Sequence, residues 1–151
     1  MKLENLELYR IKTLLNTKII ESNSPFAESV FIEILIRLND LLGLLDKNGQ
    51  RITFVDDVDV QGEVKDITDL VSKLRNASCH VRSGNIQIGT NIFVFNRFFG
   101  YTPNGIKMGE IVLGSQYKDD TAFYYGLFRI YLNRHIKRLI EEISPLYNVK
   151  E

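Results

Sequence analysis

The stretch that decides the fold is Ser24 to Asp46, SPFAESVFIEILIRLNDLLGLLD. Ser24 suits an N-cap, and Pro25 suits the first helical position after it. Apolar side chains then recur at helical spacing on most sides of the segment, from Phe26 to Leu45. A helix that is apolar on most sides has to be covered by its neighbours or by a partner chain. The sequence therefore predicts a long central helix.

Two further helices are expected around it. Residues 3–21 carry an apolar stripe at helical spacing, formed by Leu8, Ile11, Leu15 and Ile19. Asp66 is the expected N-cap of a third helix, with Asp69 in the first turn, where the helix dipole favours an anion. This third helix has to stop by Ser83-Gly84. Residues 51–60 fit either a short strand or an ordered loop.

The pattern changes between residues 85 and 115, where apolar and polar residues alternate. Pro103-Asn104-Gly105 is a turn signal, so this segment predicts one or two β-hairpins. Asp119 or Asp120 is the expected cap of a fourth helix that runs to about Ile143. The predicted fold is mostly α: a four-helix antiparallel bundle with a β-hairpin insertion at about 85–115, between the third and fourth helices.

Composition indicates an ordinary globular protein. The chain has 151 residues, 44% hydrophobic and 25% charged, and a formal net charge of zero. We expect a single domain over 1–151. No leader segment and no membrane span is indicated, so we predict a cytoplasmic protein that does not associate with membranes. The single Cys79 excludes an internal disulfide, and no zinc set or other cofactor is expected.

The charges are unevenly distributed. Residues 46–69 contain seven acids and three bases. Residues 70–109 contain no acid and five bases, which are Lys73, Arg75, Arg82, Arg97 and Lys107. A phosphate bound within that second window would meet no acidic sequence neighbour. Zero net charge nevertheless argues against strong non-specific binding of nucleic acid.

Within that window lies Arg75-Asn76-Ala77-Ser78-Cys79-His80. His suits proton transfer at neutral pH, and Arg suits a phosphate. Asn76 and His80 are four residues apart and share a helix face, so Asn76 is placed to orient the imidazole. Arg75 would lie about 140° away from His80 on an unbroken helix. It must reach round, or the helix must break before His80, or another chain must complete the site.

The sequence pattern Arg-Asn-x-x-x-His resembles the motif of the HEPN superfamily. These are all-α domains found in many prokaryotic ribonuclease toxins and defence proteins. Arg75, Asn76 and His80 match its three fixed positions. The resemblance implies a homodimer with both motifs lining one cleft and metal-independent endoribonuclease activity on RNA. Catalytic roles then fall to Arg75, Asn76 and His80, with Lys73 and Arg82 as weaker candidates for contacts to the RNA backbone. A cognate antitoxin or regulatory protein is a further expected partner.

Other candidates are weaker. Arg129 and His135 have similar spacing, but Ile130 follows the arginine, and we interpret His135 as a surface or groove histidine. Asp56-Asp57-Val58-Asp59 could suggest Mg²⁺, but a solvated turn is the simpler interpretation. Two alternatives to the ribonuclease stay open: a catalytically inactive HEPN dimer that binds nucleotide, RNA or a protein partner, and a structural bundle whose motif is fortuitous.

Overall fold

The computed structural model describes residues 2–79, 87–88, 91–92 and 95–147. Within them the helices are α1 (Leu3–Asn16), η1 (Ile19–Glu21), α2 (Ala27–Lys47), α3 (Ile67–Cys79), η2 (Leu132–Lys137), α4 (Arg138–Ile143) and η3 (Ser144–Tyr147). The strands are β1 (Gln87–Ile88), β2 (Asn91–Ile92), β3 (Asn96–Phe99), β4 (Thr102–Met108), β5 (Ile111–Ser115), β6 (Thr121–Tyr125) and β7 (Phe128–Tyr131). No described helix is long and apolar enough to cross a bilayer.

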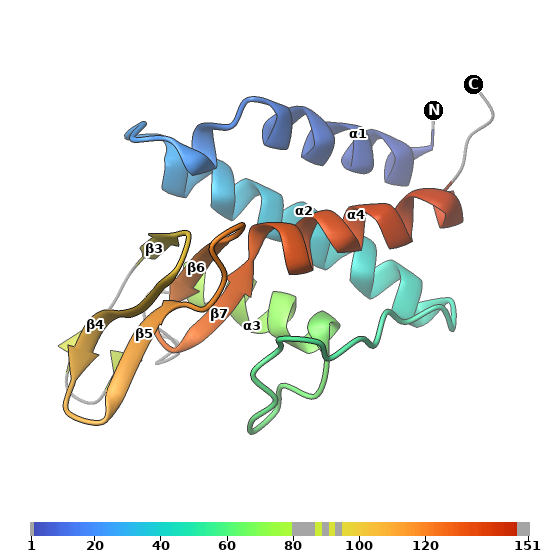
Figure 1. Ribbon diagram of the computed structural model, residues 1–151. Coiled ribbons are helices and arrows are strands. Elements are labelled where there is room, and N and C mark those ends of the chain that lie inside the picture. The colour runs from blue at the N-terminus through green and yellow to red at the C-terminus, as the bar shows by residue number, and fades with distance from the viewer. Residues whose placement is uncertain (1, 80–86, 89–90, 93–94, 148–151) are drawn as a thin grey trace.

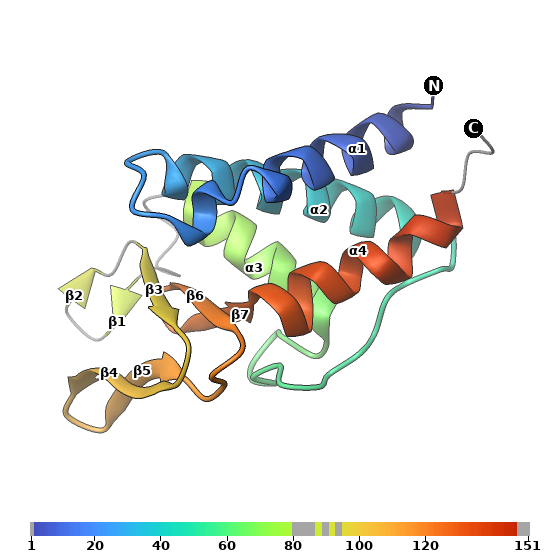
Figure 2. The ribbon, with the colours of Figure 1, turned by 45° about the horizontal axis from the view of Figure 1, so that its top comes forward.

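The predicted central helix is confirmed as α2. Eight of its residues are buried, among them Phe31, Leu35, Leu38 and Leu42. It packs against both α1 and α3, and Figure 2 shows it alongside α1. The segment before it differs from expectation, because Pro25 and Phe26 form a turn and the helix begins at Ala27. The first predicted helix is also shorter, since Lys18 adopts a left-handed conformation with φ of 56°.

The predicted fold class is wrong, because the described chain is not a helical bundle with one inserted hairpin. Strands β3, β6 and β7 form a three-stranded antiparallel sheet in the order β3-β6-β7. Two hairpins, β1-β2 and β4-β5, accompany it. In Figures 1 and 2 the strands gather on one side of the molecule and the helices on the other, with β4 and β5 far from α1. The described architecture is therefore a mixture of helices and antiparallel sheet.

The fourth predicted helix accounts for much of this error. Residues 121–131, which we expected to be helical, are β6, a turn and β7, and the helix begins only at Leu132. Gly126 makes the turn with φ of 57°, a conformation that favours glycine. All five residues of β6 are buried. A strand buried on both faces lacks the polar–apolar alternation that identifies half-buried strands in a sequence.

The sheet is covered on both faces. Phe123 and Tyr125 of β6 belong to the main core with α2, where Phe123 stacks on Phe31 with ring centroids 4.6 Å apart. On the other face, the β4-β5 hairpin completes a second core that includes Phe98, Leu113 and Tyr124. The described strands thus bury aromatic side chains in two separate layers.

The predicted turn at Pro103-Asn104-Gly105 lies instead inside β4, and the hairpin turns at Gly109-Glu110. A Cβ on Gly105 would lie 2.2 Å from Cε1 of Phe98. Gly105 is therefore required for close packing of the hairpin on the sheet. The register of β4 against β5 shifts between Thr102 and Ile106, which accommodates the proline at position 103.

Candidate functional site

Helix α3 carries the first two residues of the Arg-Asn-x-x-x-His motif. The predicted cap is confirmed: Asp66 Oδ1 accepts a hydrogen bond from the backbone N–H of Asp69 at 3.0 Å. Arg51 donates to Asp66 at 2.9 Å and to Asp69 at 2.7 Å. Residues 51–60 form an ordered loop, of which the side chain of Arg51 is one anchor. The start of α3 is thus fixed by capping and by ion pairs.

Arg75 and Asn76 lie near the end of α3, and both are half-buried. Arg75 Nη1 donates to Asn76 Oδ1 at 3.4 Å, which is long for a hydrogen bond. Ser78 Oγ donates to the carbonyl of Arg75 at 2.9 Å. The structure therefore brings the guanidinium and the amide together. His80 and Arg82, the other predicted site residues of this segment, lie outside the described residues.

Two acid–base groups that sequence reasoning missed belong to the same region. Tyr125 of β6 donates its hydroxyl to Glu28 Oε1 of α2 at 3.1 Å. Burial raises the pKa of Tyr125, and the nearby Glu28 carboxylate and Cys79 thiol raise it further. Strand β6, which carries Tyr125, contacts α3. Glu28 and Tyr125 are 97 residues apart, so no local pattern relates them.

Lys73, a weaker candidate for an RNA contact, forms an ion pair with Glu63. The lysine side chain is 25% exposed, while that of Glu63 is 78% exposed. The same ion pair lowers the pKa of Glu63. The basic character that the sequence assigns to α3 is therefore partly neutralised by the acidic segment before it.

His135 is a buried structural residue, so its interpretation as a surface or groove histidine is wrong. Its Nδ1 accepts a hydrogen bond from the backbone N–H of Tyr131 at 2.9 Å. Its Nε2 lies 3.0 Å from the carbonyl of Asp56, to which it can only donate. These partners require the neutral imidazole with the proton on Nε2. Burial lowers the pKa of His135, consistent with that form.

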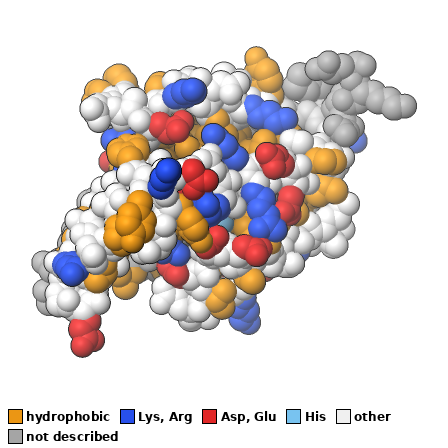
Figure 3. All heavy atoms as spheres, in the orientation of Figure 1, with side chains coloured by type: hydrophobic (Ala, Val, Ile, Leu, Met, Phe, Trp, Pro, Cys, Tyr) orange, Lys and Arg blue, Asp and Glu red, His pale blue; other side chains and the backbone are white. Residues whose placement is uncertain are grey.

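The acids around His135 pair with arginines of η2 and α4. Arg138 pairs with Asp56 at 2.9 Å and with Glu142 at 2.8 Å. Arg134 pairs with Asp119 and Asp120, each at 3.1 Å. Figure 3 shows acidic and basic side chains interspersed on this face. Among the described residues, no three His, Cys, Asp or Glu side chains are grouped to hold a metal ion.

Asp120 connects the sheet to the last helices. The sequence suggested that Asp119 or Asp120 would cap a helix beginning beside it. Asp120 does act as a cap, but across space: its carboxylate accepts from the backbone N–H groups of Asn133 at 2.8 Å and Arg134 at 3.0 Å. The capped helix begins after β6 and β7 have intervened.

The chain matches no family model, no curated protein and no solved structure. The described part combines helices with antiparallel strands, and its candidate site is the Arg75-Asn76 pair at the end of α3. The likeness to the HEPN superfamily therefore depends on the motif residues themselves.

Proposed function

We propose that this protein is a metal-independent endoribonuclease of the HEPN type, a toxin or defence enzyme acting in the cytoplasm. The observation that carries the proposal is the contact between Arg75 and Asn76 in the last turns of α3, with Asn76 four residues before His80 in the chain. A guanidinium, an amide and an imidazole can together supply the charge stabilisation, the orientation and the proton transfer that cleavage of a phosphodiester without a metal needs.

In this proposal a base takes the proton of the ribose 2′-hydroxyl as its oxygen attacks the phosphorus, and the bond from phosphorus to the 5′-oxygen breaks as an acid protonates that leaving oxygen. His80 acts as general acid or base, or as a phosphate ligand. Arg75 stabilises the negative charge that develops on the phosphoryl oxygens. Asn76 has its amide oxygen toward Arg75, which leaves its NH₂ group to orient His80. The products are a 2′,3′-cyclic phosphate and a free 5′-hydroxyl.

We further propose a homodimer in which two copies of the motif line one RNA cleft. Arg82 and Lys73 would contact the RNA backbone there. Binding would require Lys73 to exchange Glu63 for a phosphate, and Glu63 is exposed enough to be displaced. A cognate antitoxin or regulatory protein would act by covering this cleft.

The second candidate is a dimer that binds nucleotide, RNA or a protein partner without cleaving RNA. Ion pairing favours it, because Lys73 is paired with an acid and the arginines at 129, 134 and 138 are too. Paired cations attract a polyanion less strongly than free ones. The two candidates differ in their products, because only the first releases 2′,3′-cyclic phosphate.

The test is cleavage of a single-stranded RNA in EDTA by wild type, Arg75→Ala and His80→Ala. Arg10→Ala is the matched control for loss of a positive charge, since Arg10 lies on α1 with a 47% exposed side chain. We expect cleavage by wild type and the control, and at least a hundredfold loss, on the order of the general acid–base contribution, in the other two. An RNA with a single 2′-deoxyribose at the cleaved linkage should resist cleavage. Equal activity of all four proteins would refute the proposal.

A further inference from the structure

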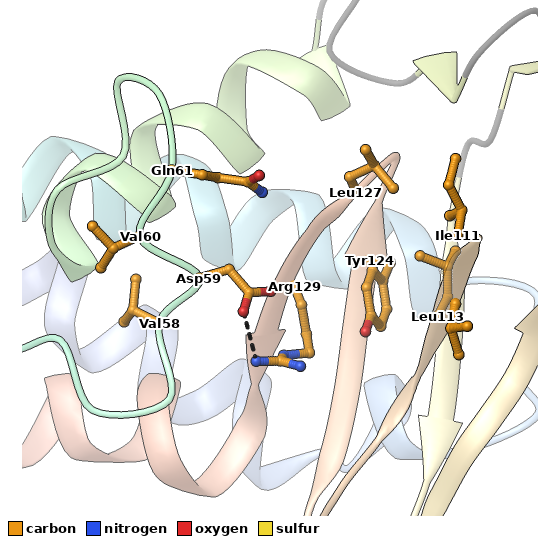
Figure 4. A pocket seen from close by; sticks show the side chains of 10 residues that line it. Val58, Asp59, Val60, Gln61, Ile111, Leu113, Tyr124, Leu127 and Arg129 are labelled. Carbon is orange, nitrogen blue, oxygen red and sulfur yellow. Dashed lines mark hydrogen bonds and ion pairs between the residues drawn. The ribbon is translucent and has the colours of Figure 1, made fainter.

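A hollow of ≈ 580 Å³ lies between the loop 58–61 and the strands β5, β6 and β7. Figure 4 shows side chains of the loop on one side and those of Ile111, Leu113, Tyr124 and Leu127 on the other, with Asp59 and Arg129 between them. Small-molecule sites commonly measure about 300–1,000 Å³. The hollow is thus large enough for a small ligand, and the proposed ribonuclease mechanism does not use it.

Exposed aliphatic side chains converge on this hollow from separate elements. Val60 of the loop is 57% exposed, Val112 of β5 is 44% exposed and Leu127 of the β6-β7 turn is 38% exposed. Single exposed apolar residues are ordinary, but several around one hollow mark a binding surface. These three side chains would be removed from water by the apolar part of a ligand.

Among the described residues that line the hollow, Arg129 is the only cationic one. Its Nη2 donates to the carbonyl of Asp57 and to Asp59 Oδ1, each at 3.2 Å. Charge-assisted hydrogen bonds are usually about 2.7–2.9 Å long, so the bond to Asp59 is a loose one. The Nε atom of Arg129 is buried and has no hydrogen-bond partner among the described residues. The hydrogen-bonding capacity of this guanidinium is therefore only partly used.

The surroundings of Arg129 keep its head group in place. The ring of Tyr131 lies below it, with the centroid 4.9 Å from the guanidinium carbon. The arginine side chain is only 16% exposed, whereas that of Asp59 is 48% exposed. An entering acceptor would therefore meet a fixed cation and a carboxylate that can turn outward into solvent.

We propose that this hollow binds a small organic anion, a carboxylate with an apolar body. The ligand carboxylate takes the place of Asp59 on Arg129, and the apolar body packs against Val60, Val112 and Leu127. A cationic ligand of the same shape is disfavoured, because binding at Asp59 would place its charge beside the guanidinium.

The probes are octanoate and octylammonium, which share an alkyl chain and differ in the sign of the head group. Isothermal titration should give one octanoate per chain and at least about tenfold weaker binding of octylammonium, as one charge–charge contact predicts. Equal affinity for the two probes, or no binding of octanoate, would overturn the proposal.

Variants at Val112 test the site without removing an ion pair. Val112→Lys and Val112→Glu both replace an exposed valine by a long polar side chain, with opposite charges. We expect Val112→Glu to weaken octanoate binding about tenfold relative to Val112→Lys. Equal losses in both variants would mean that the apolar surface alone binds the probe.

Asp59→Asn removes the carboxylate that competes for Arg129, so it should tighten octanoate binding. Glu141→Gln is the matched control, since Glu141 is an exposed acid of α4 and its loss changes net charge equally. Tightening confined to Asp59→Asn supports direct competition. Weaker binding by a folded Asp59→Asn protein contradicts it, and the Val112 pair remains decisive if this variant unfolds.

Discussion

The helical and strand parts of the molecule bury apolar surface by different means. The buried residues of α2 are aliphatic apart from Phe31. The strand part buries tyrosines, whose hydroxyls need partners. Tyr124 donates to the carbonyl of Gly114 at 2.9 Å, and Tyr131 accepts from the backbone N–H of Gln116 at 3.1 Å. The packing of the helical core therefore depends on side-chain volume. The packing of the strand core depends also on the direction of hydrogen bonds.

The two parts are joined by polar groups rather than by apolar packing alone. Arg97 of β3 donates to the carbonyls of Ile20 and Ser22 at 2.9 and 2.7 Å. Asp120 connects the loop before β6 to the helix after β7. Removing one of these groups should therefore weaken the connection between the strand part and the helical part.

The largest expected effect is that of Asp120→Ala. The substitution leaves the backbone N–H groups of Asn133 and Arg134 without their acceptor and removes a buried partner of Arg134. Loss of a cap and of a buried hydrogen-bonded charge should lower the free energy of unfolding by about 2–4 kcal/mol. Urea denaturation measures the change.

Asp119→Ala is the matched control for Asp120→Ala. The carboxylate of Asp119 also pairs with Arg134, but its side chain is 73% exposed. An exposed ion pair contributes about 0–1 kcal/mol. Similar destabilisation by both substitutions would show that the ion pairs of Arg134, and not the capping of the helix, stabilise the junction of the strand part with the helical part.

This difference between the parts also explains what the sequence could predict. The helical spacing of α2 and the cap at Asp66 are local, and both were predicted. In β6, burial of every residue removed the alternation, and the spacing of Phe128, Leu132 and Ile136 imitated a continuous helix. The partnership of Asp120 with Asn133 and Arg134 depends on the turn of the sheet, which no helical pattern contains.

The contacts of the candidate site are also of two kinds, those between neighbours in the sequence and those between distant segments. Arg75 and Asn76 are adjacent in the sequence, so their contact follows from local spacing. Glu28 and Tyr125 meet only because β6 packs beside the start of α2. The lining of the hollow around Arg129 comes from the loop, β5 and the β6-β7 strands. Such groupings depend on the pairing of strands that the predicted bundle did not contain.

Adding one methyl group to a glycine should have a smaller effect on the free energy of unfolding. The sign of this effect should differ between the two parts. Gly105→Ala should destabilise the strand part by about 1–3 kcal/mol, because the new Cβ overlaps the ring of Phe98. Phe98 cannot move away freely, since it packs edge-on against Tyr124 with centroids 5.5 Å apart. Gly43→Ala should stabilise α2 by up to about 1 kcal/mol, since no described atom beyond its chain neighbours and the helix's own backbone lies within 4 Å of the new Cβ.

Thermal unfolding of both glycine variants measures this contrast. The two substitutions make the same chemical change, so their difference reports packing and backbone preference alone. A stabilised Gly105→Ala protein would mean that the β4-β5 hairpin does not pack against Phe98 as described.

The smallest expected effect is the dependence of stability on pH through His135. Burial lowers its pKa in the folded protein, helped by Arg129, while the carbonyl of Asp56 and the carboxylates of Asp57 and Asp120 oppose the shift. The unfolded chain, with an ordinary pKa of about 6.5, then binds the proton more readily. This contribution to stability is complete above about pH 6.5 and is lost as the pH falls toward the lowered pKa of His135. The free energy of unfolding should fall by no more than about 1.4 kcal/mol per pH unit.

Urea denaturation between pH 7.5 and about pH 5 isolates this effect, because paired carboxylates with lowered pKa values, such as Asp56 and Asp119, protonate only at lower pH. His135→Gln cannot titrate, so its free energy of unfolding should vary less with pH than that of the wild type. His80→Ala removes the other histidine and serves as the control. The opposite result would contradict this assignment. If the free energy of unfolding no longer varies with pH in His80→Ala but still does in His135→Gln, then His80 and not His135 couples folding to pH.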